Sequence, residues 1–314
     1  MAYIHSNGIG TNTVSAHSDR AIALKVFSGE VLTAFEEKNI FMNLVQTRTI
    51  SSGKSAQFPV IGSYTDAVAE HVPGTDIDVK GIAAGERVIT IDNLKYASVF
   101  VDNFEEAMAH YEVRGQYSME MGRKLASTVD GDVVTTLRNC IGKNQAGVAN
   151  ANAVAAATGQ PAAEAAYLDA GVLTTDSAEA AGNKIIDAIF QAQTKLDEKD
   201  VPGERYVVVT PADYYKLVQS SKGTNSDYTV SNGGIDTGKI TRIAGNNILV
   251  SNRLAAGEIL VFTTNAIGIV KLLDVKTESN YIPEKLGDLM TSSYAMGFGV
   301  LNPGCVVAID AKAA

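Results

Sequence analysis

One amphipathic segment restricts what this chain can fold into more than any other feature. Asn103 can cap a helix, Glu105 and Glu106 then occupy its first turn, where the helix dipole favours negative charge, and the helical pattern runs to about Cys140. Apolar residues recur at every fourth position: Val113, Tyr117, Met121, Leu125, Val129, Val133 and Leu137. About 37 residues at roughly 1.5 Å each predict a helix roughly 55 Å long. That is longer than a compact domain of this size is wide, so we expect a strut.

Glycine interrupts this helical pattern at three positions. We expect close approach of a neighbouring element, or a bend, at Gly115, Gly122 and Gly131.

The second unusual feature is a polar segment between two strand patterns. Residues 56–61 read as a short strand, and Pro59 within it favours an edge position. Residues 86–101 read as one long strand rich in Val, Ile, Thr and Tyr. The connection between them, residues 62–85, is polar, and an isolated two-stranded ribbon is only marginally stable in water. We therefore expect an arm that finds its partner elsewhere, with another molecule as one candidate.

The rest of the chain predicts further helices and strands. Residues 1–17 read as a tail, residues 40–50 as extended chain, and the Ala-rich residues 146–171 as a surface insertion or loop. A helix from Ser18 or Asp19 to about Lys38 is indicated by an apolar stripe of Leu24, Phe27, Val31 and Phe35.

The second half of the chain has an α/β pattern. One helix face consists of Gly182, Ile185, Ile189, Ala192 and Leu196. Residues 205–210 then predict a strand, and Thr210-Pro211 with Asp213 predicts the start of a helix. Residues 221–239 read as a loop. Strand patterns follow at 240–250, at 258–262 and over most of 266–310.

Composition bounds the function. The 314 residues suggest about two domains, and 46% apolar against 19% charged residues argues against disorder. The net charge of −9, without any dense Lys/Arg cluster, disfavours tight binding of nucleic acid. Cys140 and Cys305 lack paired spacing, which disfavours zinc and a disulfide framework and fits a reducing cytosol. We find neither the apolar stretch of a signal peptide nor a membrane-spanning run.

The motifs of catalysis and nucleotide binding are incomplete. Gly233 to Lys239 has the glycines and lysine of a phosphate-binding loop, but Ile240 replaces the required Ser/Thr. The dinucleotide-like pattern from Gly297 has Asn302 in place of its last glycine, so we interpret these glycines as turn residues. Glu106 and His110 could form half a metal site, without a visible third ligand. We predict no catalytic, metal or cofactor site, although a triad assembled in space stays open.

Five stretches of the sequence are similar to a known family. They are residues 25–35 (KVFSGEVLTAF), 48–62 (RTISSGKSAQFPVIG), 86–92 (ERVITID), 105–114 (EEAMAHYEVR) and 294–297 (YAMG). The chain resembles the major capsid proteins of short-tailed, autographivirus-type podoviruses related to T7, with the HK97-type capsid fold. A cyanophage is one candidate source. Residues 141–265 match only in pattern.

The resemblance implies an α+β fold with four regions. Residues 1–50 would be an N-terminal arm, and residues 51–97 an extended loop that lies over a neighbouring subunit. Residues 98–145 and 266–314 would form a peripheral domain around the long spine helix. Residues 146–265 would form an axial domain at the centres of hexamers and pentamers.

The resemblance also implies a structural protein and not an enzyme, without cofactor or metal. Its copies would form an icosahedral head shell around double-stranded DNA, in the virion, after assembly in the host bacterial cytoplasm. Scaffolding, portal and decoration proteins are the implied partners, while DNA is enclosed without specific tight binding and no membrane is involved. The net charge of −9 agrees with DNA that does not adhere to the wall.

Residues within the matching stretches are candidates for contact between subunits, with an ordinary role in the fold as the alternative for each. They are Lys25, Phe27, Glu30, Phe35, Arg48, Lys54, Phe58, Arg87, Glu105, Glu106 and Arg114. Some proteins of this fold form Lys–Asn crosslinks, for which Lys54, Lys80 and Lys95 are placed in or beside the extended loop, but we predict none.

Two other functions stay open from sequence. A cellular nanocompartment shell would use the same fold around an enzyme cargo. An α/β enzyme would bind a phosphorylated ligand at residues 233–239.

Overall fold

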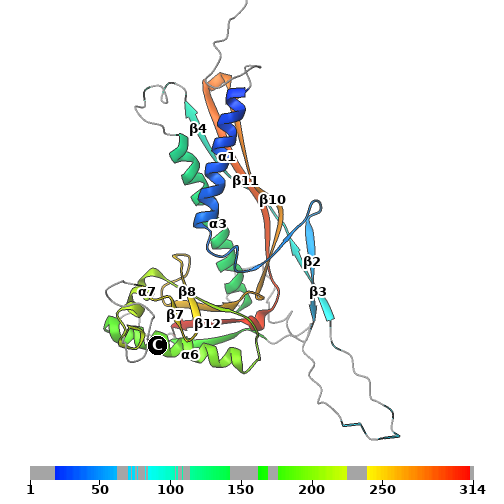
Figure 1. The fold of residues 1–314 in the computed structure, drawn as a ribbon, viewed down its shortest axis with the longest axis vertical. Coiled ribbons are helices and arrows are strands. Elements are labelled where there is room, and N and C mark those ends of the chain that lie inside the picture. The colour runs from blue at the N-terminus through cyan, green and yellow to red at the C-terminus, as the bar shows by residue number, and fades with distance from the viewer. Residues whose placement is uncertain are drawn as a thin grey trace, which may run out of the picture.

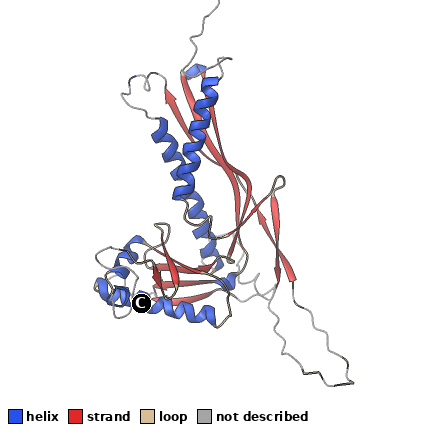
Figure 2. Cartoon of the chain, viewed as in Figure 1, coloured by secondary structure: helices blue, strands red, loops and turns tan. Residues whose placement is uncertain are grey.

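A computed structural model describes residues 18–61, 84–102, 114–141, 162–168, 176–224 and 239–311, with isolated positions between 70 and 108. Figure 1 shows an elongated upright part, in which two helices lie along long strands, and a more compact part at its foot. A two-stranded ribbon stands on the other side of the long strands, away from the helices (Figure 2).

The upright part consists of two helices packed on a four-stranded sheet. The helices are α1 (Ser18–Lys38) and α3 (Arg114–Cys140). The strands, in spatial order, are β1 (Gln46–Thr49), β10 (Ile267–Ile282), β11 (Gly287–Val300) and β4 (Lys95–Asp102). β1 is parallel to β10 and the other pairs are antiparallel. A short 3₁₀ turn (Pro283–Lys285) and the left-handed Leu286 join β10 to β11.

The predicted strut is present, and its apolar stripe forms the core. Met121, Leu125, Val129, Val133 and Leu137 are all buried, whereas Tyr117 is 40% exposed. The described helix begins at Arg114, so it has 27 residues, about 40 Å. The predicted start near Asn103, with Glu105 and Glu106, lies outside the described residues.

The second predicted helix is present as α1, and its contact with α3 explains the glycine at position 122 in the first half of α3. The two helices cross so closely that a Cβ on Gly122 would stand 2.5 Å from the carbonyl oxygen of Val31 and 2.9 Å from Cβ of Ala34. Phe27, Val31 and Phe35 of α1 are buried. The expected close approach at Gly122 is therefore confirmed.

The compact part contains a six-stranded sheet with helices packed on it. Its strands, in spatial order, are β5 (Glu164–Leu168), β12 (Val306–Ala311), β9 (Glu258–Thr263), β6 (Arg205–Val209), β8 (Asn246–Val250) and β7 (Arg242–Ile243). Its helices are α6 (Ala178–Asp197), α7 (Pro211–Val218) and α8 (Ser221–Thr224), and a 3₁₀ turn (Pro303–Cys305) precedes β12.

The sequence predicts the two longer helices of the compact part, and α7 begins where it was predicted to begin. Ser177 caps α6, and Ile185, Ile189 and Leu196 on its predicted face are fully buried. Thr210 caps α7 by accepting a hydrogen bond from the backbone N–H of Asp213 at 3.2 Å.

Several sequence expectations about the strands are wrong. The predicted loop at 146–171 contains β5, which pairs in parallel with β12. The predicted strand at 240–250 is a hairpin, since Ala244 and Gly245 both have positive φ, as a type I′ turn requires. The predicted strand at 86–101 is interrupted at 91–94 and divides between two sheets.

The grouping of all of residues 266–314 with the long helix also needs correction. β10 and β11 do lie beside α3, but β12 crosses into the six-stranded sheet between β5 and β9. Val306, Val307, Ala308 and Ile309 of β12 are fully buried there, so the end of the chain ties the two parts together.

Candidate intersubunit surfaces

The projecting ribbon consists of β2 (Ser55–Ile61) and β3 (Ala84–Thr90), paired antiparallel. Side chains of β2 alternate strictly between buried and exposed, as expected for a strand with one covered face. Ala56, Phe58 and Ile89 pack with Val270 and Leu301 of the body in a small separate core.

Glycines of β11 allow this close contact. A Cβ on Gly299 would stand 2.5 Å from Cγ1 of Ile89, and one on Gly297 would stand 2.5 Å from the carbonyl oxygen of Thr90. The interpretation of these glycines as turn residues is therefore wrong, because they lie inside a strand that the ribbon covers. Glycine is required at both positions because the ribbon, which is distant in sequence, packs directly against them.

Two predicted contact residues anchor the ribbon within the chain. The Arg48 guanidinium lies 6.0 Å from the centre of the Phe58 ring and donates a hydrogen bond to the Gln57 carbonyl. The Lys54 carbonyl accepts a hydrogen bond from the Ile91 N–H at 2.8 Å, while its side chain is exposed.

Arg87 lies on the inner face of β3, in register with Phe58. Its Nε and Nη2 atoms are buried and have no hydrogen-bond partner within the described residues. Burial lowers the pKa of Arg87, because desolvation disfavours the charged form.

Two further predicted residues connect the upright elements to each other. Arg114 Nη2 of α3 lies 3.0 Å from Asp288 Oδ2 of β11. The Glu30 carboxylate of α1 accepts a hydrogen bond from Ser118 Oγ of α3. Both pairs orient α3 within one subunit.

The structure gives three aromatic candidates a role inside the subunit. Phe27, Phe35 and Phe58 are at most 9% exposed, so the alternative of an ordinary role in the fold applies to them. The side chain of Lys25, and Glu105 and Glu106 entirely, lie outside the described residues.

An exposed apolar surface was missed from sequence. Along β4, Ala97 and Val99 pack toward the helices. The alternating residues Tyr96, 69% exposed, and Phe100, 40% exposed, therefore face away from them. Lys285 Nζ lies 6.0 Å from the centre of the Phe100 ring. The period-two pattern of residues 95–102 is the sequence feature that could have indicated this surface.

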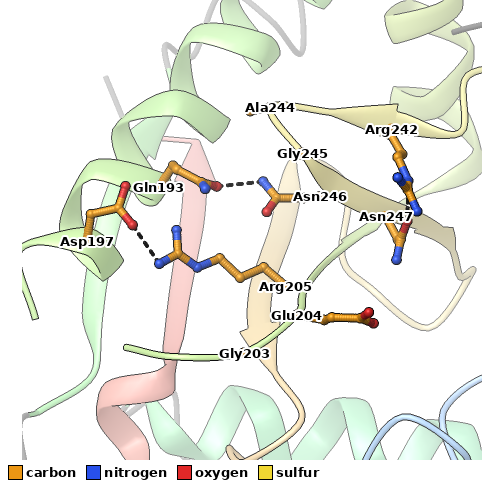
Figure 3. A pocket seen from close by; sticks show the side chains of 10 residues that line it. All are labelled: Gln193, Asp197, Gly203, Glu204, Arg205, Arg242, Ala244, Gly245, Asn246 and Asn247. Atoms are coloured by element: carbon orange, nitrogen blue, oxygen red, sulfur yellow. Dashed lines mark hydrogen bonds and ion pairs between the residues drawn. The ribbon is translucent and has the colours of Figure 1, made fainter. Parts of the chain in front are cut away.

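A polar hollow of about 370 Å³ lies at the β7–β8 edge of the compact part (Figure 3). Its side chains already pair with one another. Arg205 Nη2 contacts Asp197 Oδ1 at 2.6 Å, Asn246 Nδ2 contacts Gln193 Oε1 at 2.7 Å, and Arg242 Nε contacts Asn247 Oδ1 at 3.0 Å. No nucleophile lies beside a base among its lining residues.

The cysteine thiols are poor nucleophiles. Burial raises the pKa of Cys140 to about 12, and burial also raises the pKa of Cys305. Within the described residues no cluster of three or more His, Cys, Asp or Glu side chains could hold a metal ion. Of the predicted phosphate-loop segment 233–239, only Lys239 is among the described residues.

None of the helices in the described part of the chain combines the length and apolar character needed to cross a membrane.

A long helix against an elongated sheet, a projecting β ribbon and a separate α/β part define the HK97-like class of shell proteins. The Gp10A-like major capsid protein family matches residues 57–263. The major capsid protein of Escherichia phage T7 is 30% identical over 96% of this chain and 95% of its own length, and that of Enterobacteria phage T3 is 30% identical over 96% and 95%. A capsid structure of cyanophage P-SCSP1u aligns with a TM-score of 0.70 at 32% identity, covering 88% of this chain and 89% of that chain.

The chain belongs to the Gp10A-like family and is a major capsid protein of a tailed phage. These matches favour the capsid prediction over the nanocompartment shell and over the α/β enzyme.

Proposed function

We propose that copies of this chain assemble as hexamers and pentamers into the icosahedral head shell around a double-stranded DNA genome. Assembly takes place in the host bacterial cytoplasm with scaffolding and portal proteins, and a decoration protein is a further partner. Residues 1–50 act as the arm and 51–97 as the extended loop. The spine helix with β10 and β11 forms the peripheral domain, and residues 146–265 with β12 form the axial domain. The chain acts as a structural subunit without catalysis.

The main support for this proposal is that the outward face of the ribbon exposes apolar side chains. Its inner face is anchored on the body, but Ile61 is 72% exposed and Val88 is 55% exposed. In the described structure β2 and β3 pair only with each other, so each also has one unpaired strand edge. Exposed apolar side chains beside free strand edges are a typical surface for another chain.

The outward face of β4 offers a second surface to a neighbouring copy. Tyr96 and Phe100 supply large rings there, and aromatic residues of this kind are enriched where protein surfaces meet. We include Arg48, Lys54 and Arg87 among the contact residues, together with Lys25, Glu30, Glu105, Glu106 and Arg114.

Co-expression with the scaffolding protein, followed by negative-stain electron microscopy, tests the role of the ribbon. Val88→Asp would place a carboxylate in the apolar contact, where an unpaired charge is strongly unfavourable, so we expect few or no closed shells. Val88→Thr is the matched control, because it keeps the branched shape and β propensity without a charge. Deletion of residues 62–85 should likewise leave a soluble chain that does not close shells.

Normal shells from both Val88→Asp and the deletion would exclude the ribbon as an intersubunit contact. Circular dichroism and melting of the unassembled variants must match wild type, so that a loss of shells reports assembly rather than folding.

A further inference from the structure

A second hollow, of about 320 Å³, lies where the upright part meets the six-stranded part. Lys38 contributes from the end of α1, and Arg123, Ser127 and Asp130 contribute from one side of α3. Arg253 contributes from the segment that follows β8. Figure 1 shows this segment rising from the compact part toward the upright helices. Three elements that are distant in sequence therefore line one recess.

The lining is positively charged. It contains three cationic side chains against the single carboxylate of Asp130, in a chain whose net charge is −9. Lys38 and Arg253 form no ion pair within the described part of the chain. Arg123 pairs with Glu120 at 2.8 Å, but both side chains are about 60% exposed, and ion pairs that open to solvent are weak.

The Asp130 carboxylate does not neutralise these cations by direct pairing. It is 5% exposed and accepts hydrogen bonds from the backbone N–H groups of Ile40 and Phe41, at 3.3 Å. Arg253 is held in place by a hydrogen bond from its Nη2 to Ser127 Oγ. Lys38 and Arg253 thus have no carboxylate of the described residues in direct contact, although the charge of Arg253 acts on Asp130, and Arg253 is positioned by Ser127.

We propose that this hollow binds a phosphate-type oxyanion. A tetrahedral dianion presents oxygens in several directions, so it can pair with cations from three elements at once, whereas a carboxylate has only two oxygens. Its charge matches the excess of positive charge on the lining, and arginine and lysine are the usual partners of phosphate. The bound anion would connect α1 and α3 to the six-stranded part.

The hollow in Figure 3 lacks these properties. Its two arginines already contact Asp197 and Asn247. It also carries Glu204 in addition to Asp197, so an anion would meet two carboxylates and no excess of positive charge.

Titration of the unassembled full-length chain with inorganic phosphate tests the site. Calorimetry and thermal unfolding would be followed at constant pH and ionic strength, with chloride as the reference anion. We expect saturable binding with a Kd of about 1–10 mM and a rise in Tm as phosphate occupies the folded state. Lys38→Ala and Arg123→Ala should each weaken binding about fivefold or more, since each removes a charge-assisted contact.

Lys276→Ala is the matched control, because Lys276 is an exposed lysine on β10 that pairs with Glu278 at 2.7 Å. It should leave phosphate binding unchanged. Arg253→Lys keeps the charge at the third cationic position, so it should weaken phosphate binding less than Lys38→Ala does.

The outcomes separate the sources of the phosphate group. A short DNA duplex that competes with phosphate supports the site and identifies the nucleic-acid backbone as ligand. Phosphate that binds without such competition supports the site with free phosphate as ligand. Equal binding by wild type, Lys38→Ala and Arg123→Ala would overturn the proposal, as would a glutamate peptide that binds these cations where phosphate does not.

Discussion

The crossing of α1 and α3 makes a prediction about two glycines on touching helices. A Cβ added to Gly29 of α1 would have no atom within 4 Å, whereas a Cβ added to Gly122 of α3 would meet the backbone of α1. Substitution by alanine should therefore have opposite effects at the two positions. At Gly29 only the helix propensity changes, so Gly29→Ala should stabilise the chain by about 0.5–1 kcal/mol.

At Gly122 the same gain opposes a steric cost. Non-bonded carbon atoms normally lie about 3.5–4.0 Å apart, but the new Cβ would stand 2.5 Å from the Val31 carbonyl oxygen and 2.9 Å from Cβ of Ala34. A backbone carbonyl inside a helix cannot rotate away, so the helices must separate. Overpacking of this kind costs about 1–3 kcal/mol. After the gain in propensity of about 1 kcal/mol, we expect a net loss of up to about 2 kcal/mol.

Thermal unfolding of the unassembled chain measures both effects. In a protein of this size about 1 kcal/mol shifts the Tm by roughly 2 °C, so Gly29→Ala should melt higher than wild type and Gly122→Ala lower. The double variant should lie between them. If Gly122→Ala melts at or above Gly29→Ala, the helices do not approach each other as described and the reasoning fails.

Burial raises the pKa of Asp130 to about 6, so the folded state binds a proton that the unfolded state releases. The stability contributed by Asp130 is therefore full below about pH 4 and is lost as pH rises through about 6, by on the order of 3 kcal/mol. Asp130→Asn should abolish this component of Tm measured against pH. Leu137→Ala should cost about 2–5 kcal/mol in urea denaturation, because Leu137 is fully buried. Thr210→Ala should cost about 1 kcal/mol through loss of the α7 cap, while Thr210→Ser restores the stability. Mature shells dissolved in denaturant should release only monomers on a gel, and covalent oligomers would contradict the prediction of no crosslinks. Of the three candidate lysines, Lys95 is already paired with Asp132.

The candidate surfaces were only partly visible in the sequence. The ribbon could be predicted, because strand patterns on either side of a polar segment leave two strands without a core of their own. Its contact residues could not be separated from its core residues. Phe58 and Val88 both read as apolar strand residues, and only the packing of Phe58 on the body shows which one faces outward.

The sequence by itself determined the elements whose signals are local. The apolar period predicts α1, α3 and α6, because residues three and four positions apart in a helix lie on one face. Thr210-Pro211 predicts the start of α7, because a capping side chain satisfies the first backbone N–H groups. The short strand predicted at residues 56–61 is likewise present as β2.

Only the tertiary structure decided what depends on contacts distant in sequence. β5 is a strand because β12 pairs with it, although its Ala-rich sequence has little strand propensity. The glycines at 297 and 299 are required by the ribbon above them, and the positive hollow exists because Lys38, Arg123 and Arg253 meet from three elements. Strand pairing and charge clustering depend on which separate segments come into contact. The spacing of residues within one segment does not determine those contacts.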